Sequence, residues 1–138
     1  LFDTISHLNL SQSLTIAEKL MQIKNTSPIQ IIAGLTFCFR RLFDWHFVIK
    51  ANNGFNETAV KSKGFTSKTI IEQYKRASKN FSIKDVERIL GLLNNIDFEM
   101  RLTGTNFQSI LLEYLIYLIV KKHGIMVSSY VSHPYKMF

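Results

Sequence analysis

Cysteine, proline and glycine are scarce in this sequence, and each shortage excludes a class of structure. The 138 residues include 1 Cys, 2 Pro and 6 Gly. A single cysteine rules out an internal disulfide framework and any zinc site built from several cysteines. So few turn-forming residues argue against a β-sandwich or barrel. The length fits one domain, large enough to bury a core without a metal or a disulfide.

Acidic residues are also few. The chain has 10 Asp+Glu against 17 Lys+Arg, which gives a net charge of +7. Most of this excess lies between Lys50 and Lys79, where seven basic residues accompany two acidic ones, a local net charge of +5. Such a concentration indicates one basic surface region. It favours an acidic partner such as nucleic acid or a negatively charged protein surface.

No apolar run is long enough to cross a membrane. The most apolar stretch, 110–120, is interrupted by Glu113 and falls short of the roughly 20 residues that a membrane span needs. We therefore expect a soluble protein without a membrane partner. Because the first residue is Leu rather than Met, we also expect a fragment of a longer protein, in which no targeting or lipidation motif can be recognised.

The side chains that usually carry chemistry are not arranged for it. Cys38 lies on an apolar helical stripe with no visible activating base, so we interpret it as a core residue. The glycines are isolated and form neither a phosphate-binding loop nor a dinucleotide fingerprint. No pair of histidines has the i, i+4 spacing of a helical metal site; they are His7, His46, His123 and His133. We expect no cofactor, no metal and no enzyme active site in these residues.

Apolar spacing predicts helices along most of the chain, and no clear strand. The predicted fold class is all-α, a compact bundle of about five or six helices over residues 1–124, followed by an unassigned tail at 125–138. The connection 55–64 shows only weak patterning. The predicted helices are a short one at 2–8, then 14–21 capped by Ser11 or Ser13, 28–50 capped by Ser27, 65–78, 82–100 capped by Ser82, and 105–123 capped by Thr105.

Two of these helices compete for the centre of the bundle. The helix after Pro28 carries two apolar stripes, the second of which includes Phe43 and Phe47, so it should be covered on two sides. The last helix has almost no polar face. A domain of this size holds two central helices with difficulty, so we expect the last helix to present a protein–protein interface. The candidate interface residues are Leu111, Tyr114, Leu115 and Leu118.

The basic region allows two interpretations. Lys68, Lys75 and Lys79 recur at helical spacing and could share one face. A solvated face that maintains solubility explains such charges and is the commoner case. A phosphate-contacting face needs several basic residues on one side. The candidate nucleic-acid-facing residues are Lys61, Lys63, Lys68, Lys75, Lys79 and Arg101.

The order of segments resembles the C-terminal domain of the delta subunit of bacterial DNA polymerase III, a clamp-loader subunit. The resemblance runs from Leu1 to about Val120 and lies in order and spacing rather than in a catalytic motif. The connection 55–64 is more basic than the family pattern, and the tail after Gly124 has no counterpart. The matching segments are Leu1-Phe2-Asp3, Pro28 to Leu35, Phe39-Arg40-Arg41-Leu42, Tyr74-Lys75-Arg76-Ala77, Phe81-Ser82 and Arg101 to Gly104.

The resemblance implies a collar domain, the part by which clamp-loader subunits pack side by side into a ring. The partners would be the ATP-hydrolysing subunits and delta-prime, with primed DNA nearby, in the bacterial cytoplasm. The sliding clamp would be contacted only through N-terminal domains that this sequence does not contain. The fragment would act by assembly as a non-catalytic part of a DNA-directed DNA polymerase holoenzyme.

Two other interpretations stay open on the sequence. A stand-alone basic helical module that binds nucleic acid would show salt-sensitive binding that weakens when Lys68, Lys75 and Lys79 are neutralised. An unrelated helical structural or regulatory domain would use its basic face only for solubility. The ordered resemblance and the strongly apolar last helix favour the collar domain.

Overall fold

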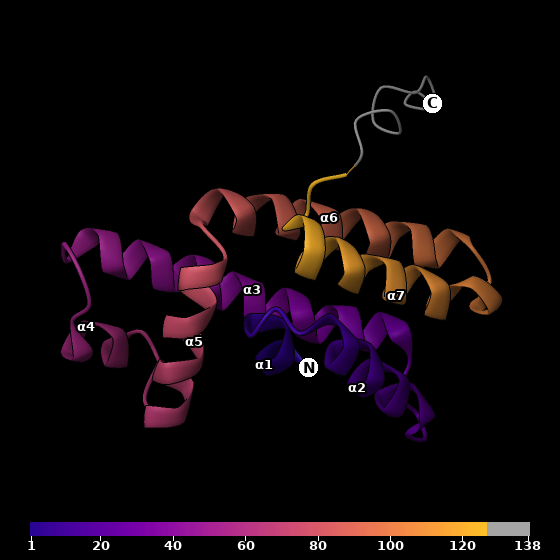
Figure 1. Cartoon of the computed structure of the whole chain (residues 1–138), viewed down its shortest axis with the longest axis horizontal. Helices are drawn as coiled ribbons and strands as arrows, with labels where there is room; N and C mark the ends of the chain where they lie inside the picture. The colour runs from indigo at the N-terminus through magenta and orange to yellow at the C-terminus, as the bar shows by residue number, and fades with distance from the viewer. Residues whose placement is uncertain (127–138) are drawn as a thin grey trace.

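The structure is a computed structural model that describes residues 1–126, and these fold into a helical bundle (Figure 1). Seven helices and no strand occur within this range, which confirms the all-α class. The helices are α1 (Phe2–Ser6), α2 (Leu10–Gln22), α3 (Pro28–Ala51), α4 (Glu57–Ser62), α5 (Lys68–Asn80), α6 (Ile83–Leu102) and α7 (Thr105–Lys122). The tail was predicted at 125–138, and its residues from 127 onward lie outside the described range.

The predicted count of five or six helices is lower than the seven observed, because α4 lies in the segment interpreted as a connection. Asn56 begins this helix by accepting a hydrogen bond from the Ala59 backbone N–H at 3.0 Å. Val60 is the one residue of α4 that is buried. A helix of 6 residues with a single buried position has no apolar repeat for a sequence pattern to reveal.

Helix α3 is the longest helix and contacts α2, α4, α5, α6 and α7 (Figure 1). Its first turn is fixed by a reciprocal capping box between Ser27 and Gln30, with Pro28 at the first helical position, as predicted. Helices α6 and α7 form an antiparallel hairpin that packs over α3 (Figure 1). Helix α2 packs against α7 and also contacts α3, and α1 packs against α2 and α5. Helix α5 crosses the C-terminal half of α3 and lies next to α4 (Figure 1).

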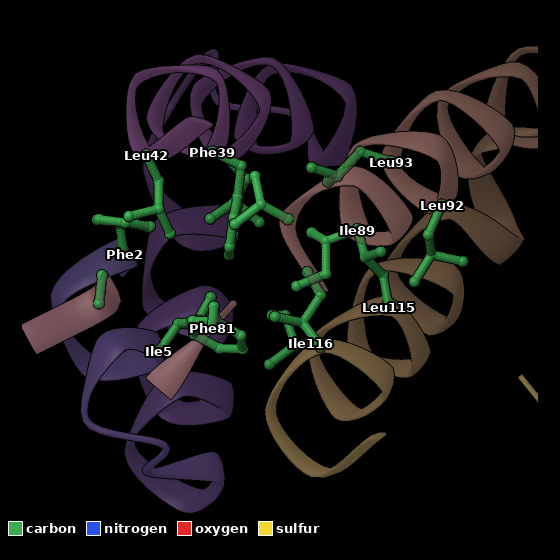
Figure 2. Packing of buried hydrophobic residues seen from close by; sticks show 14 of the residues in the cluster. Phe2, Ile5, Phe39, Leu42, Phe81, Ile89, Leu92, Leu93, Leu115 and Ile116 are labelled. Atoms are coloured by element: carbon green, nitrogen blue, oxygen red, sulfur yellow. The ribbon is translucent and has the colours of Figure 1, made fainter. Parts of the chain in front are cut away.

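The main core lies where α1, α3, α6 and α7 meet (Figure 2). Phe39 is fully buried and packs edge-on against Phe2 and Phe81, with ring centroids 5.3 and 5.6 Å apart. Ile89 of α6 and Ile116 of α7 close the core from the hairpin side (Figure 2). Burying large side chains of this kind contributes roughly 1.5–3 kcal/mol each, so this cluster holds the hairpin onto α3.

A second, aromatic cluster fastens α5 to α3. Trp45 meets Phe65 edge-on at 5.2 Å, and Phe65 meets Tyr74 at 5.1 Å. The guanidinium of Arg41 lies 4.1 Å from the centroid of the Phe65 ring and donates a hydrogen bond to the Gly64 carbonyl at 3.1 Å. The aromatic cluster therefore fixes the position of α5, which carries four basic residues, relative to α3.

Three local predictions were wrong. Phe47 of the expected second apolar stripe is 66% exposed, although Phe39 of the same stripe is fully buried. Asn9, rather than Ser11 or Ser13, caps α2, and Ser13 is buried inside that helix. Helix α7 begins after Gly104 without a side-chain cap, so Thr105 does not have the predicted capping role. By contrast, Ser82 caps α6 as predicted.

Candidate functional site

Large apolar side chains are exposed around the turn between α6 and α7. Phe98 and Leu102 come from the last turns of α6, and Phe107 and Ile110 from the first turns of α7; each is 58–69% exposed. Tyr114 follows one turn further along α7 and is also exposed. We call these five residues the apolar end. Single exposed apolar residues are ordinary, whereas several on adjoining helical turns are a candidate interaction surface.

The predicted interface residues of α7 divide into two pairs. Leu115 and Leu118 are 0% and 2% exposed and belong to the core of this chain, so neither can contact a partner while the domain is folded. Tyr114 is exposed and Leu111 is half-buried. The sequence pattern could not separate them, because α7 is apolar on every side and only its neighbours α2, α3 and α6 determine which side is covered.

Most basic residues of the 50–79 region lie on α4 and α5, at the other end of the molecule (Figure 1). Lys61, Lys68 and Lys75 line one surface cavity of about 290 Å³ between these helices, together with Thr66. Phe55, Glu57, Ile71 and Glu72 complete its wall. We call this cavity the lysine pocket. The lysine pocket thus brings together three lysines from a span of 14 positions, Lys61 to Lys75.

Two of the three ammonium groups are held by neighbours. The Lys61 Nζ lies 2.8 Å from the Glu57 carboxylate, and this hydrogen bond holds the pKa of Glu57 below its ordinary value. The Lys75 Nζ lies 3.9 Å from the centroid of the Phe55 ring, a cation–π contact. Lys68 stands at the first position of α5 and is exposed. The pocket is therefore a pre-arranged group of positive charges with two carboxylates in its wall.

The remaining candidate nucleic-acid residues lie outside the pocket. Lys79 is exposed on the same stripe of α5 as Lys68 and Lys75, near the end of that helix, and Lys63 caps the end of α4. Arg101 lies at the opposite end of the bundle, where its guanidinium donates two hydrogen bonds to Asp97, at 3.1 and 3.2 Å. The structure therefore brings five of the six candidates to the α4–α5 end and separates Arg101 from them.

Side chains that could support catalysis or hold a metal are dispersed. Within residues 1–126 no group of three or more His, Cys, Asp or Glu side chains could hold a metal ion. Burial raises the pKa of the Cys38 thiol, which opposes formation of a nucleophilic thiolate. His46 is half-buried and donates from Nε2 to the Phe81 carbonyl at 2.8 Å, a structural contact between α3 and the start of α6.

None of the helices in the described range is long and apolar enough to cross a membrane. The apolar character of α7 is instead satisfied inside the bundle, where Leu112, Leu115 and Ile116 are fully buried. Among the surfaces that the bundle leaves exposed, the apolar end and the α4–α5 end are the two that carry candidate functional residues.

Comparison with protein families gives one result over most of the chain. The family described as DNA polymerase III delta subunit, C-terminal domain, matches residues 1–119. The chain belongs to this family. It is therefore a domain of a clamp-loader subunit, as the order of its segments predicted. Searches of curated proteins and of solved structures each find no significant match.

Within this delta-subunit domain, the surface that sequence reasoning missed is the α6 half of the apolar end. Phe98 and Leu102 lie four residues apart, on the side of α6 opposite the buried Val86 and Leu93. Their spacing already set them off from the core stripe of α6. Two apolar residues one turn apart on an otherwise polar helix face are a signal that a search for core residues alone passes over.

Proposed function

We propose that this domain is the collar domain of the delta subunit and that it joins neighbouring clamp-loader subunits through its apolar end. The observation that carries the proposal is the exposure of Phe98, Leu102, Phe107 and Ile110 on the helical turns that adjoin the connection between α6 and α7. Between Gly104 and Val120 the only charged residue is Glu113. Depletion of charge together with exposed aromatic and apolar side chains is typical of the centre of a protein–protein interface.

The proposed interface uses part of the predicted set and adds to it. Tyr114 and Leu111 keep their predicted place, with Tyr114 supplying an aromatic anchor of the type that often dominates binding energy. Leu115 and Leu118 support it from beneath, since they pack α7 onto the core. The partners we propose are the ATP-hydrolysing subunits and delta-prime, in the bacterial cytoplasm. The domain then acts by assembly and without catalysis of its own.

The experiment that tests this role is native mass spectrometry of the full-length parent protein with the candidate clamp-loader subunits. The complex is compared with and without residues 1–119. Loss of the complex on deletion supports the collar role, and a complex that survives deletion contradicts it. Because a deletion can also disturb the remaining protein, point variants of the apolar end are needed beside it.

The point variants compare two exposed phenylalanines at opposite ends of the domain. Phe107→Ser removes an anchor from the apolar end, whereas Phe47→Ser removes a similarly exposed ring near the far end of α3. Neither ring belongs to the core, so both variants should fold. We expect Phe107→Ser to weaken assembly at least tenfold, the effect of about 1.4 kcal/mol, and Phe47→Ser to leave it unchanged. Equal effects of the two variants would contradict the proposed location.

A further inference from the structure

The lysine pocket has a geometry that the collar role does not use. It lies between α4 and α5, at the end of the molecule away from the turn between α6 and α7 (Figure 1). Assembly through the apolar end would leave it accessible. We propose that the lysine pocket binds the phosphodiester backbone of nucleic acid, so that the domain contacts protein at one end and nucleic acid at the other.

The first argument is the pre-arrangement of charge. Glu57 holds the Lys61 ammonium at 2.8 Å, and the Phe55 ring holds the Lys75 ammonium at 3.9 Å from its centroid. Long side chains lose rotamer freedom when they bind a ligand. Lys61 and Lys75 are already held at the wall of the pocket in the folded protein. Binding therefore removes less side-chain conformational entropy from them than from free surface lysines. Phe55 and Glu57 are thus positioning residues for the two lysines.

The second argument is the shape of the positive surface beyond the pocket. Lys68, Lys75 and Lys79 lie along one exposed stripe of α5, at intervals of seven and four residues. At about 1.5 Å per residue the stripe is roughly 16 Å long. One strand of B-DNA carries a phosphate about every 3.4 Å along its axis. A linear, regularly charged polymer therefore matches this stripe better than a compact anion would.

The third argument is the chemistry of the groups present. Lysine ammonium groups bind phosphate as point charges without a fixed orientation, and the Thr66 hydroxyl at the pocket wall is a suitable partner for a phosphate oxygen. No arginine lines the pocket, so there is no planar fork for bidentate recognition of a base edge. The expected binding is consequently independent of base sequence and sensitive to salt.

Binding is tested by fluorescence anisotropy with the 138-residue chain and two labelled probes, a 20-nucleotide single strand and a 20-base-pair duplex. The affinity for each is measured over a range of salt concentrations. Lys68→Gln and the double variant Lys61→Gln/Lys75→Gln are compared with Lys19→Gln, an exposed lysine on α2 at the other end of the bundle. Thermal unfolding followed by circular dichroism confirms that every variant is folded.

The expected result is binding of at least one probe, with a log–log salt slope that falls by about one unit for each pocket lysine removed. Lys19→Gln should leave the slope and the affinity unchanged. The probe that binds more tightly identifies single-stranded or duplex backbone as the natural source. Absence of binding to both probes would overturn the proposal, and so would an equal loss in Lys19→Gln, since the latter would show that net charge alone is responsible.

Three further measurements separate this site from its alternatives. Phe55→Leu keeps the charge of Lys75 but removes the cation–π contact, so it should weaken binding several-fold while leaving the salt slope unchanged. An unchanged affinity would contradict the positioning role.

A polyglutamate peptide should compete poorly with the nucleic-acid probe. Equal competition would overturn the proposal in favour of an acidic protein partner. Assembly with clamp-loader subunits, measured on the same lysine variants, should be unaffected, so failure here is distinct from failure of the collar role.

Discussion

Asp85 and His123 connect the first turn of α6 to the end of α7. The Asp85 Oδ2 lies 3.5 Å from the His123 Nδ1 and also accepts a hydrogen bond from the Ser82 backbone N–H at 3.0 Å. The other oxygen of Asp85 accepts from Arg88 at 3.0 Å, and Arg88 donates in turn to the His123 carbonyl at 3.2 Å. The Asp85 carboxylate thus completes the capping box of α6 and links the start of α6 to the C-terminal end of α7.

Replacing Asp85 should destabilise the fold in a way that depends on pH. Partial burial by itself raises the pKa of Asp85, but the hydrogen bonds from Ser82 and Arg88 and the nearby His123 outweigh it, so the pKa is held below its ordinary value. A carboxyl with a depressed pKa in the folded state stabilises the fold above its unfolded pKa, near 3.9, and loses that contribution as the pH falls through the folded value.

We therefore expect Asp85→Ala to lower the free energy of unfolding by about 1–2 kcal/mol at pH 7. The difference from the natural sequence should shrink below about pH 4. Urea unfolding at several pH values measures both. Asp44→Ala, which removes an exposed carboxylate of α3, is the matched control and should have little effect. A difference that is constant with pH would contradict the proposed role of the charge.

Gly124 and Gly91 should respond in opposite ways to the same substitution. Gly124 has φ +84°, and a Cβ there would lie 3.0 Å from the Ile89 Cγ1 and 3.3 Å from the Ile89 backbone nitrogen. Gly91 lies inside α6, and a Cβ there would meet nothing within 4 Å. We expect Gly124→Ala to destabilise the fold by more than about 1 kcal/mol and Gly91→Ala to stabilise it by about 0.5–1 kcal/mol. Thermal unfolding of the two variants checks the difference in sign.

Two adjacent arginines in α3 should differ in their importance for folding. Arg41 lies over the Phe65 ring and donates to the Gly64 carbonyl, whereas Arg40 is exposed. A cation–π contact contributes about 0.5–2 kcal/mol and a hydrogen bond about 1 kcal/mol. Arg41→Gln should therefore cost about 1–2 kcal/mol in urea unfolding, and Arg40→Gln less than about 0.5 kcal/mol. Similar costs for both would show that the aromatic cluster does not depend on Arg41.

The sequence predicted the helices well where apolar repeats are long. The capping boxes at Ser27 and Ser82 marked two helix starts correctly, because each is a local exchange of hydrogen bonds. The burial of individual residues on α7 could not be predicted in this way. Leu115 and Tyr114 are neighbours in an apolar helix, and which of them is covered depends on how α2 and α6 pack against it.

For the candidate surfaces too, the sequence predicted the local helical spacing but not which distant segments come together. The helical spacing of Lys68, Lys75 and Lys79 correctly placed them on one exposed stripe. Lys61 joins them only because α4 turns back toward α5, and α4 is too short to be seen in the sequence. Arg101 was grouped with these lysines on sequence evidence, yet α6 carries it to the opposite end, where it pairs with Asp97. Tertiary contacts between distant segments decide both outcomes.

The α6 half of the apolar end provides the sharpest test of the proposed collar interface. Phe98 and Leu102 are 62% and 69% exposed, so changing them to serine removes little buried surface, and the stability of the isolated domain should change by less than about 0.5 kcal/mol. In an interface they would be among the anchors. We expect Phe98→Ser/Leu102→Ser to abolish the ability of the isolated domain to compete with the full-length subunit for its partners, while the natural domain and Phe47→Ser compete. If the double variant competes as well as the natural domain, the α6 half of the apolar end does not belong to the interface, and the proposed location is contradicted.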